Sequence, residues 1–367
     1  MSRAITAAVL RHPDQPFRLE ELRLPEPAED QILVRVVASG MCHTDLMPRQ
    51  TGSFVRPPIV VGHEGAGVVE ALGSRVTDVA VGDHVVLTFD SCGACHNCRD
   101  GHPAYCQTFW RRNMGGQATN GRAPATDAHG LPVAVRWFGQ SSFATHALAS
   151  RRNAVTVDPT LPLHLLGPLG CSVQTGAGSI ITALAVTLGD TVAVFGTGSV
   201  GLAAVMAAHA VGAVTIVAVD AQPKRLELAR ELGATHTVSS GTEDVRRALK
   251  RIAPAGLDAA LDTTGVAEVV DAALGALRLR GRCGLVGTPR GPLELSPTAV
   301  SLGRSVHGIL QGDAVPHHFI PQLIELWRHG RLPFDRLVTE YALGDINEAE
   351  RAMRAGEVIK PVLRPAP

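Results

Sequence analysis

One stretch constrains the fold more than any other: DTVAVFGTGSVGLAAVMAAHAVGAVTIVAVD, residues 190–220. TVAVFG is a short apolar run rich in β-branched residues, which predicts a buried strand, and VTIVAVD predicts a second one. An apolar helix separates them. Gly-x-Gly-x-x-Gly is weak evidence alone. With a strand before it, a helix after it and an acid ending the second strand, it indicates a dinucleotide-binding turn.

The glycines of this turn have separate expected roles. Gly196 permits the tight turn, Gly198 lets a pyrophosphate approach the backbone, and Gly201 lets the helix pack closely on the strand. The helix then offers free N–H groups and a positive dipole end to the phosphates, at Ser199 and Val200. We expect this turn to hold the pyrophosphate of a dinucleotide.

The residue after the second strand predicts which dinucleotide binds. Asp220 would accept hydrogen bonds from the adenosine ribose, and its charge would repel a 2′-phosphate, which favours NAD over NADP. Lys224 and Arg225 follow closely and weaken that preference. Thr264, after a later strand, is a further cofactor-side candidate. The alternative is a flavin or another nucleotide in the same fold.

The rest of the chain divides into two kinds of sequence. Strands and helices continue to alternate after residue 234, which predicts a doubly wound parallel sheet. Residues 1–172 contain short strands with many glycines and prolines, typical of a β-rich, partly barrel-like domain. Within them, the polar, glycine-rich segment 111–132 is either a lid or a mobile surface loop. A chain of 367 residues is long enough for both domains.

Charge and hydropathy exclude several classes of protein. The chain has 34 basic and 34 acidic residues, so nothing favours binding to nucleic acid or to an anionic membrane. No apolar run reaches the roughly 18 residues of a membrane helix. The N-terminal apolar stretch is interrupted by charge and proline, unlike a signal peptide. We expect a cytoplasmic protein, in which the seven cysteines are seldom disulfides.

Four of those cysteines are grouped in CGACHNCRDGHPAYC, with the spacing C-x2-C-x2-C-x7-C. Two-residue gaps let successive thiolates turn toward one small ion, and four thiolates close a tetrahedral shell around structural zinc. An iron–sulfur cluster also takes four thiolates, and a disulfide knot is the third alternative. The four residues are Cys92, Cys95, Cys98 and Cys106.

Two further cysteines and a histidine fit the other kind of zinc site. A catalytic zinc takes three protein ligands, of which two cysteines and one histidine are a known set, and keeps an open position. Cys42, His63 and Cys171 supply that set if the fold brings them together. Each alone is more simply explained as a core residue. Cys283, in an apolar strand, is interpreted as core.

These motifs together resemble those of the zinc-dependent medium-chain alcohol dehydrogenases, over essentially the whole chain. GHEGAGVV, the four-cysteine lobe, GTGSVG and the closing DINEA and GEVIKPV carry the resemblance. CHTDL, SCGACHNC, FGQSSFATHA and LGPLGCSVQTGAG look most like the aryl-alcohol (benzyl alcohol) and geraniol dehydrogenase branch. The resemblance implies a GroES-like catalytic domain over 1–172 and 310–367, with a structural zinc lobe near 90–110, and a Rossmann domain over 173–309.

The resemblance implies a role for each matching residue. It makes Cys42, His63 and Cys171 the ligands of the catalytic zinc, and the lobe cysteines those of a second, structural zinc. Glu64 resembles the acid behind the zinc, and Asp45 the carboxylate that orients the histidine ligand. The other implied roles are proton acceptor from the alcohol for Thr44, contact with the cofactor pyrophosphate for His43 and Lys360, ribose acid for Asp220 and adenosine contact for Arg225.

One position departs from the family pattern. The best-known members have a proton-relaying histidine where this chain has Met47, which carries no proton. The relay then passes through water, the cofactor ribose or His43. Met47 also puts an apolar side chain where the substrate pocket begins, and an aromatic or allylic alcohol needs a flat apolar slot. The aromatic candidates for its wall are Phe89, Trp110, Trp137 and Phe138, each of which is otherwise a core residue.

The expected reaction is therefore reversible hydride transfer between a primary aromatic or allylic alcohol and NAD. One alternative is a thiol-dependent formaldehyde dehydrogenase, with Arg111, Arg112 and Arg151 at the pocket mouth. The other is a zinc-free, quinone-reductase-like binding protein. Relatives pair their nucleotide-domain sheets edge to edge, which implies a homodimer or homotetramer with the strand near segment 291–297 as the edge.

Overall fold

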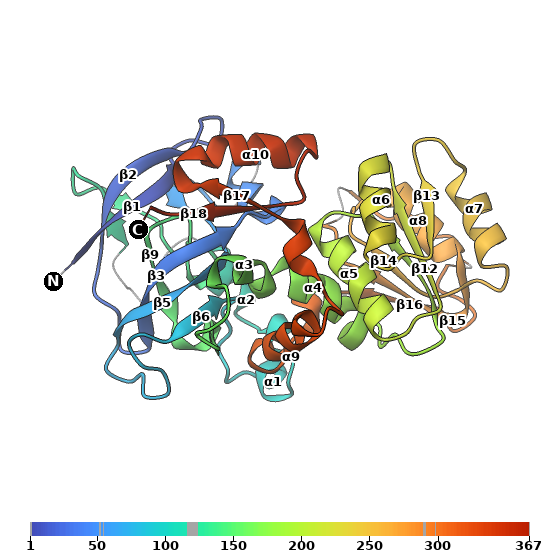
Figure 1. Cartoon of the computed structure of the whole chain (residues 1–367), viewed down its shortest axis with the longest axis horizontal. Helices are drawn as coiled ribbons and strands as arrows, with labels where there is room; N and C mark the ends of the chain where they lie inside the picture. Colours follow the sequence, from blue (N-terminus) through green and yellow to red (C-terminus); the bar gives the residue numbers. More distant parts are fainter. Residues whose placement is uncertain are drawn as a thin grey trace. The chain divides into compact units, whose positions relative to one another are not determined.

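The computed structural model describes residues 2–50, 53, 55–115, 124–288, 291–297 and 299–366, and Figure 1 shows the order of its elements. The chain forms two compact units. Unit 1 contains 1–171, 315–321 and 335–367, and unit 2 contains 172–314 and 322–334. The sequence-based boundaries lay at 172/173 and 309/310. Part of the predicted loop 111–132, residues 116–123, lies outside the described residues.

Unit 1 is built on two antiparallel-rich sheets (Figure 1). The five-stranded sheet has the order β4-β1-β2-β7-β8, and the other has the path β10-β6-β5-β3-β18-β17, with β9 paired to β3. The strands are β1 (Arg3–Leu10), β2 (Arg18–Leu24), β3 (Gln31–Gly40), β4 (Ile59–Val60), β5 (Glu64–Leu72), β6 (His84–Leu87), β7 (Ala125–Thr126), β8 (Pro132–Val133), β9 (His146–Ser150), β10 (Ala154–Val157), β17 (Val338–Ala342) and β18 (Lys360–Arg364).

Strand β3 is the strand on which unit 1 is organised. It pairs antiparallel with β5, β9 and β18. Alternate residues Ile32, Val34 and Val36 lie in one buried cluster with side chains of β5 and β6, as the two-residue period of a strand requires. The helices of unit 1 are short: α1 (His96–Arg99), α2 (Phe109–Asn113), α3 (Leu163–Leu166) and the longer α10 (Ile346–Ala355).

Unit 2 is the predicted doubly wound domain. Its six strands are all parallel and have the order β13-β12-β11-β14-β15-β16, which is the 3-2-1-4-5-6 order of a dinucleotide-binding fold. The strands are β11 (Thr191–Phe195), β12 (Thr215–Asp220), β13 (His236–Ser239), β14 (Leu257–Asp262), β15 (Leu277–Leu285) and β16 (Ser305–Gly308). The helices are α4 (Ser172–Gly178), α5 (Ser199–Ala210), α6 (Pro223–Glu231), α7 (Val245–Ile252) and α8 (Ala267–Gly275), while α9 (Pro316–Arg328) contains residues of both units.

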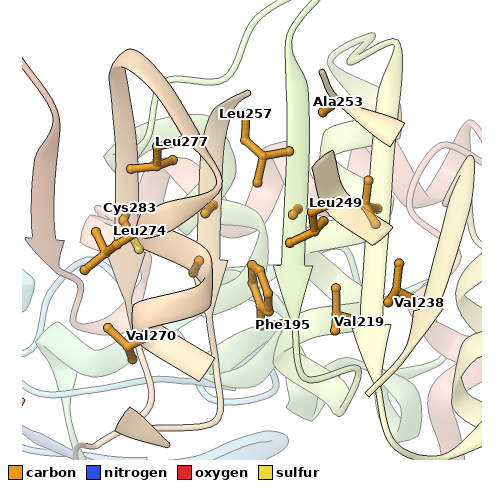
Figure 2. Close-up of a cluster of buried hydrophobic side chains, with 14 of the residues drawn as sticks. Phe195, Val219, Val238, Leu249, Ala253, Leu257, Val270, Leu274, Leu277 and Cys283 are labelled. Carbon is orange, nitrogen blue, oxygen red and sulfur yellow. The ribbon is translucent and has the colours of Figure 1, made fainter. Parts of the chain in front are cut away.

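One face of this sheet packs against α7 and α8, and Figure 2 shows the cluster they form. Phe195 and Val219 from the strands meet Leu249 from α7 and Leu274 from α8. Burying each side chain of this size contributes roughly 1.5–3 kcal/mol. Cys283 lies in the same cluster with no exposed surface, which confirms its interpretation as a core residue.

The edge of the sheet differs from the prediction. Residues 291–297 form no strand, and β16 (Ser305–Gly308) is the outermost strand beside β15. The segment 291–297 contains two prolines, which cannot donate to a strand ladder, and only one of its leucines packs against the core. The strand forms instead at SVHG, after this segment.

Candidate metal and dinucleotide sites

The pairing of β3 with β5 brings together the first two candidate metal ligands. Gly40 at the end of β3 lies opposite Glu64 at the start of β5. Cys42 comes just after the end of β3, and His63 comes just before the start of β5. The two residues therefore lie at the same end of this pair of strands. A Cβ on Gly40 would lie 2.1 Å from Glu64 Oε2, so only glycine permits this close approach.

The third candidate ligand arrives from a distant turn. Gly170 precedes Cys171 and packs so tightly against β6 that a Cβ there would lie 2.0 Å from the carbonyl oxygen of Leu87. The hydroxyl of Thr88 donates to the carbonyl of Gly170 at 2.7 Å. His63 Nε2 consequently lies 3.2 Å from Cys171 Sγ, and donor atoms of Cys42, His63, Glu64 and Cys171 all lie within 4.8 Å of one another.

This donor set fits zinc. Two sulfurs and one imidazole nitrogen are the ligands of a catalytic zinc with an open fourth position. Although burial opposes it, Asp45 and the Cys42 sulfur together raise the pKa of His63 to about 10. The pKa of Cys42 is held well below its ordinary value because its sulfur accepts hydrogen bonds from Cys171 and His63, and Lys360 adds a positive charge.

Asp45 is the centre of the hydrogen bonds around these ligands. Its Oδ1 accepts from His63 Nδ1 at 2.7 Å, from the backbone N–H of Gly62 at 3.0 Å and from Trp137 Nε1 at 2.9 Å. Its Oδ2 accepts from the backbone N–H of Cys42 at 3.0 Å. Asp45 has no exposed surface. It thus fixes the tautomer of His63, with Nε2 left to face the sulfurs.

Two aromatic residues lie beside this histidine, and their position corrects the sequence-based expectation for Trp137. The indole of Trp137 is fully buried and bonded to Asp45, so it supports the site and offers no surface to a substrate. The ring of Phe138 stacks on His63 with centroids 4.4 Å apart and planes at 24°. Nothing in the sequence signals either contact, because both depend on a turn that packs against a distant strand.

The backbone of that turn is strained. Phe138 has a φ of 49°, in the left-handed region that costs a side chain roughly 1–3 kcal/mol. The side-chain amide of Asn153 donates to the carbonyl of Phe138 at 3.1 Å. The hydroxyl of Ser141 accepts from the N–H of Trp137 at 2.9 Å and donates to the carbonyl of Val60 at 2.6 Å. These buried bonds hold the turn against its strain.

Glu64 and Lys360 form a buried ion pair behind the ligands. Lys360 Nζ donates to Glu64 Oε1 at 2.9 Å and to the carbonyl of Met41 at 3.0 Å. Burial raises the pKa of Glu64, and the charge of Lys360 opposes that rise. Burial alone would lower the pKa of Lys360, but the negative charges of Glu64 and Cys42 raise it. Lys360 was expected to contact the cofactor pyrophosphate. In the structure Lys360 is only 1% exposed, and its ammonium group is bonded to Glu64. The phosphate contact stays a prediction.

The 3₁₀ helix His43–Arg49 carries the candidates for proton transfer. Thr44 Oγ1 lies 3.8 Å from Cys42 Sγ, beside the ligand cluster. His43 is exposed, and Met47 is half-buried. The helix is held at its far end by Arg49, which donates to Glu350 Oε2 at 2.8 Å.

The other two aromatic candidates differ in exposure. Phe89 is 3% exposed and packs near Phe109, whereas Trp110 is 59% exposed. Their assignment to a substrate pocket stays a prediction.

The four lobe cysteines converge as the spacing predicts. Their sulfurs lie within 4.8 Å of one another, and all are free thiols. Cys95 and Cys98 Sγ are 3.5 Å apart, and Cys92 and Cys98 Sγ are 3.9 Å apart. Sulfurs about 2.3 Å from a tetrahedral zinc lie about 3.8 Å from one another, so the arrangement fits zinc and is too open for disulfides.

The glycine turn of unit 2 has the geometry expected of a phosphate cradle. Gly196 has a φ of 85°, and a Cβ on Gly201 would lie 1.8 Å from the carbonyl oxygen of Gly196. A Cβ on Gly198 would meet nothing within 4 Å. Gly198 precedes α5, whose first residues, Ser199 and Val200, present their N–H groups at the helix N-terminus.

Asp220 ends β12 beside this turn. Its Oδ2 accepts from the N–H of Thr197 at 2.7 Å and from the Thr197 hydroxyl at 2.9 Å, and its Oδ1 accepts from the N–H of Gln222. These bonds hold the carboxylate beside the glycines. Arg225 lies in the first turn of α6 and is half-buried.

Thr264 is held by a residue that the sequence did not single out. Its hydroxyl donates to Asp262 Oδ1 at 2.7 Å, and the N–H of Gly265 donates to Asp262 Oδ2 at 2.9 Å. Asp262 is fully buried at the end of β14. An acid at the end of a parallel strand, followed by Thr-Thr-Gly, is the signal that would have identified this loop-ordering role.

Comparison with known proteins shows the family of this chain. The family model for the alcohol dehydrogenase GroES-like domain matches residues 28–133, and that for the zinc-binding dehydrogenase domain matches 199–328. The chain is 45% identical over 361 residues to the geraniol dehydrogenase of Castellaniella defragrans, covering 97% of this chain and 96% of that protein. The chain belongs to the zinc-dependent medium-chain alcohol dehydrogenases.

Solved structures of this alcohol dehydrogenase family superpose closely. The crystal structure of an alcohol dehydrogenase zinc-binding domain protein from Burkholderia ambifaria has a TM-score of 0.97 at 49% identity, covering 99% of each chain. Benzyl alcohol dehydrogenase from Acinetobacter calcoaceticus has a TM-score of 0.93 at 42% identity, covering 99% of this chain and all of its own. The predicted family, fold and oxidoreductase activity on alcohols are confirmed.

Membership in a family of zinc-binding dehydrogenases supports an enzyme over the zinc-free, quinone-reductase-like binding protein considered from the sequence. An NDMA-dependent alcohol dehydrogenase of Amycolatopsis methanolica is 35% identical over 374 residues, covering 97% of this chain and 98% of its own.

Within the described residues, no helix combines the length and the apolar character needed to cross a bilayer.

Proposed function

We propose that this alcohol dehydrogenase oxidises primary aromatic or allylic alcohols to aldehydes with NAD, reversibly. The observation that carries the proposal is the convergence of Cys42, His63 and Cys171, with the hydroxyl of Thr44 beside them. Relatives whose names specify geraniol and benzyl alcohol, similar over nearly the full chain, support the substrate class.

Two zinc ions per chain are proposed, one in each cysteine-containing cluster. The first, held by Cys42, His63 and Cys171, would supply Lewis acidity to an alcohol oxygen at the open position, while NAD accepts the hydride. The lobe offers four sulfur ligands and no open position, so its role is to hold residues 92–106 together. Asp45 keeps the imidazole of His63 aimed at the first site.

Thr44 is the proposed acceptor of the alcohol proton. Its hydroxyl both accepts and donates, so it can pass the proton onward without a net change of charge. Met47 has no group that continues the chain, although it follows within the same 3₁₀ helix. The exposed His43, next to Thr44, is the proposed exit to solvent or to the cofactor ribose.

NAD is the proposed cofactor. Asp220 is fixed by Thr197 and Gln222 with its carboxylate beside the glycine turn, where its charge favours ribose hydroxyls over a 2′-phosphate. Ser199, Val200, Arg225 and Thr264 complete the proposed contacts in unit 2. His43 and Lys360 are the proposed phosphate contacts from unit 1.

The thiol-dependent formaldehyde alternative has less support. It requires basic side chains to be available for an anionic thiol adduct. Arg112 instead pairs with Asp90 at 3.0 Å, and Arg151 pairs with Asp78 at 2.9 Å. A homodimer or homotetramer is proposed from family resemblance alone, and light scattering distinguishes the two assemblies. A cytoplasmic location is proposed from the sequence.

A panel of alcohols tests the proposal. Benzyl alcohol, geraniol, ethanol and formaldehyde with added thiol are each compared by kcat/KM with NAD and with NADP. We expect benzyl alcohol or geraniol with NAD to give the highest value. A higher value for ethanol removes the aromatic and allylic assignment, and turnover of formaldehyde only with thiol supports the alternative.

A further inference from the structure

We infer that Trp137 is a positioning residue for the proposed metal ligand His63, acting through Asp45, and that Phe138 assists it. The inference rests on the proposed ligand role of His63. Trp137 contacts neither a proposed metal ligand nor a proposed cofactor contact by hydrogen bond; its indole N–H is bonded to Asp45 Oδ1 at 2.9 Å. That same oxygen accepts from His63 Nδ1 at 2.7 Å.

The geometry around Asp45 leaves its carboxylate one orientation. Oδ1 receives N–H groups from three directions, those of Gly62, His63 and Trp137, and Oδ2 receives the N–H of Cys42. The three bonds to Oδ1 are buried and the bond to Oδ2 is partly buried. Rotation of the carboxylate would therefore leave N–H groups without an acceptor, which is costly away from water. The other three donors belong to residues 42, 62 and 63, which are proposed ligands or lie next to one. The indole N–H reaches Asp45 from a turn outside these segments.

Phe138 restrains the same imidazole from its face. The two rings lie 4.4 Å apart at 24°, which prevents the imidazole from tilting toward that side. Consecutive residues of one turn therefore fix His63 in two ways: Trp137 through the carboxylate at Nδ1, and Phe138 through the ring face. Phe138 itself has a positive φ, of 49°.

The bond also adjusts the electron density of the histidine. A carboxylate that receives fewer N–H donors holds its negative charge more strongly toward the remaining one. Without the indole N–H, this stronger pull on the His63 proton would make the imidazole a better ligand, so a fall in metal affinity reports the loss of orientation and not the change in charge. Partners bonded directly to a ligand change metal affinity by about 10- to 100-fold when removed, and Trp137 acts one bond further away, so we expect a smaller effect.

The experiment compares Trp137→Phe with the unchanged chain, because phenylalanine keeps an aromatic ring and removes the N–H. The catalytic-site zinc dissociation constant is measured by competition with a chromogenic chelator, and the lobe zinc of the same molecule is the internal standard. We expect affinity at the catalytic site to fall by up to about 10-fold, less than for a partner bonded directly to a ligand, with the lobe unchanged. Trp327→Phe is the matched control, since Trp327 packs against Phe334 in unit 2.

A spectroscopic readout separates positioning from packing. Cobalt placed at the catalytic site of each variant reports ligand geometry through its ligand-field bands. We expect these bands to shift in Trp137→Phe and to stay unchanged in Trp327→Phe. Should Trp137→Phe fail to retain its lobe zinc, Phe138→Leu is measured instead, because it removes the ring over His63 and leaves the indole bond in place.

The outcomes distinguish this inference from the proposed function. If the unchanged chain binds no metal at Cys42, His63 and Cys171, the proposed function fails. If it binds metal there and Trp137→Phe has the same affinity and the same cobalt spectrum, the proposed function stands. In that case Trp137 is a packing residue, and the positioning role is overturned.

Discussion

The ammonium group of Lys360 lies 2.9 Å from the carboxylate of Glu64, and both side chains are sealed from solvent in unit 1. Removing one partner of such a pair leaves a buried charge without compensation, which costs about 3–5 kcal/mol. We therefore expect Lys360→Met to lower the free energy of unfolding by that amount, measured by urea denaturation.

The double variant is the control for this pair. Lys360→Met with Glu64→Gln removes both charges, and we expect it to recover most of the lost stability, because a neutral buried amide needs no counter-ion. A double variant as unstable as the sum of its two single variants would show that the two groups do not stabilise one another.

The two cysteine clusters predict separable metal contents. Cys171→Ser should leave one zinc per chain and reduce kcat/KM by more than about 100-fold, because loss of a ligand exceeds the usual effect of an outer-shell partner. The matched variant Cys98→Ser should lose the lobe zinc. Elemental analysis after dialysis measures both. Two zinc ions in the Cys171→Ser variant would remove Cys171 from the ligand set.

Two glycines of the dinucleotide turn predict opposite consequences of one added methyl group. A Cβ on Gly201 meets the carbonyl of Gly196 at 1.8 Å, so Gly201→Ala should lower the melting temperature. A Cβ on Gly198 meets nothing within 4 Å, so Gly198→Ala should keep the melting temperature and raise the KM for NAD. Thermal unfolding and NAD titration test the pair; equal melting temperatures would contradict the packing explanation.

Cofactor preference is expected to depend on the charge of Asp220. Asp220→Ala removes the repulsion of a 2′-phosphate and leaves Arg225 close by to attract it. We expect the ratio of kcat/KM for NADP to that for NAD to rise by about 10-fold or more, corresponding to 1.4 kcal/mol. Asp220→Asn is the control for size. An unchanged ratio would argue against a ribose contact.

His146 predicts a pH dependence away from both sites. Burial lowers the pKa of His146, and the positive charge of Arg3 adds to that effect. A histidine whose pKa is depressed in the folded state contributes stability above its unfolded pKa, near 6.5, and loses it as the pH falls through the folded value. The free energy of unfolding should therefore decline less on acidification in His146→Gln than in the unchanged chain. Urea titrations between about pH 7 and 5 measure this, and parallel curves would contradict it.

The features predicted correctly from the sequence are those set by residues close together in the chain. The lobe cysteines lie within one short loop, and the glycines of 196–201 lie within one turn. Periodicity also identified the parallel sheet of unit 2, because buried strands separated by helices permit few other arrangements. The convergence of Cys42, His63 and Cys171 followed from family resemblance, since no local spacing encodes it.

The features that were missed depend on contacts between distant segments. Lys360 and Glu64 are 296 positions apart, and Trp137 and Asp45 are 92 apart. An aromatic residue in a sequence indicates burial but not what its polar edge will meet. Trp137 was therefore assigned to a pocket wall, although its N–H belongs to Asp45. The edge strand was misplaced because apolar residues at 293 and 295 resemble a strand, whereas the flanking prolines prevent one.

The two metal clusters also differ in when a growing chain completes them. Domains form from the N-terminus during synthesis, and all four lobe cysteines lie within 92–106. The loop that they close is short, so its closure costs little entropy and needs no other part of the sheet. Cys171 emerges after the lobe is complete, and Lys360 emerges later still. Occupancy of the lobe by the proposed zinc would therefore mark an early stage of chain maturation, and occupancy at Cys42, His63 and Cys171 would mark a later one.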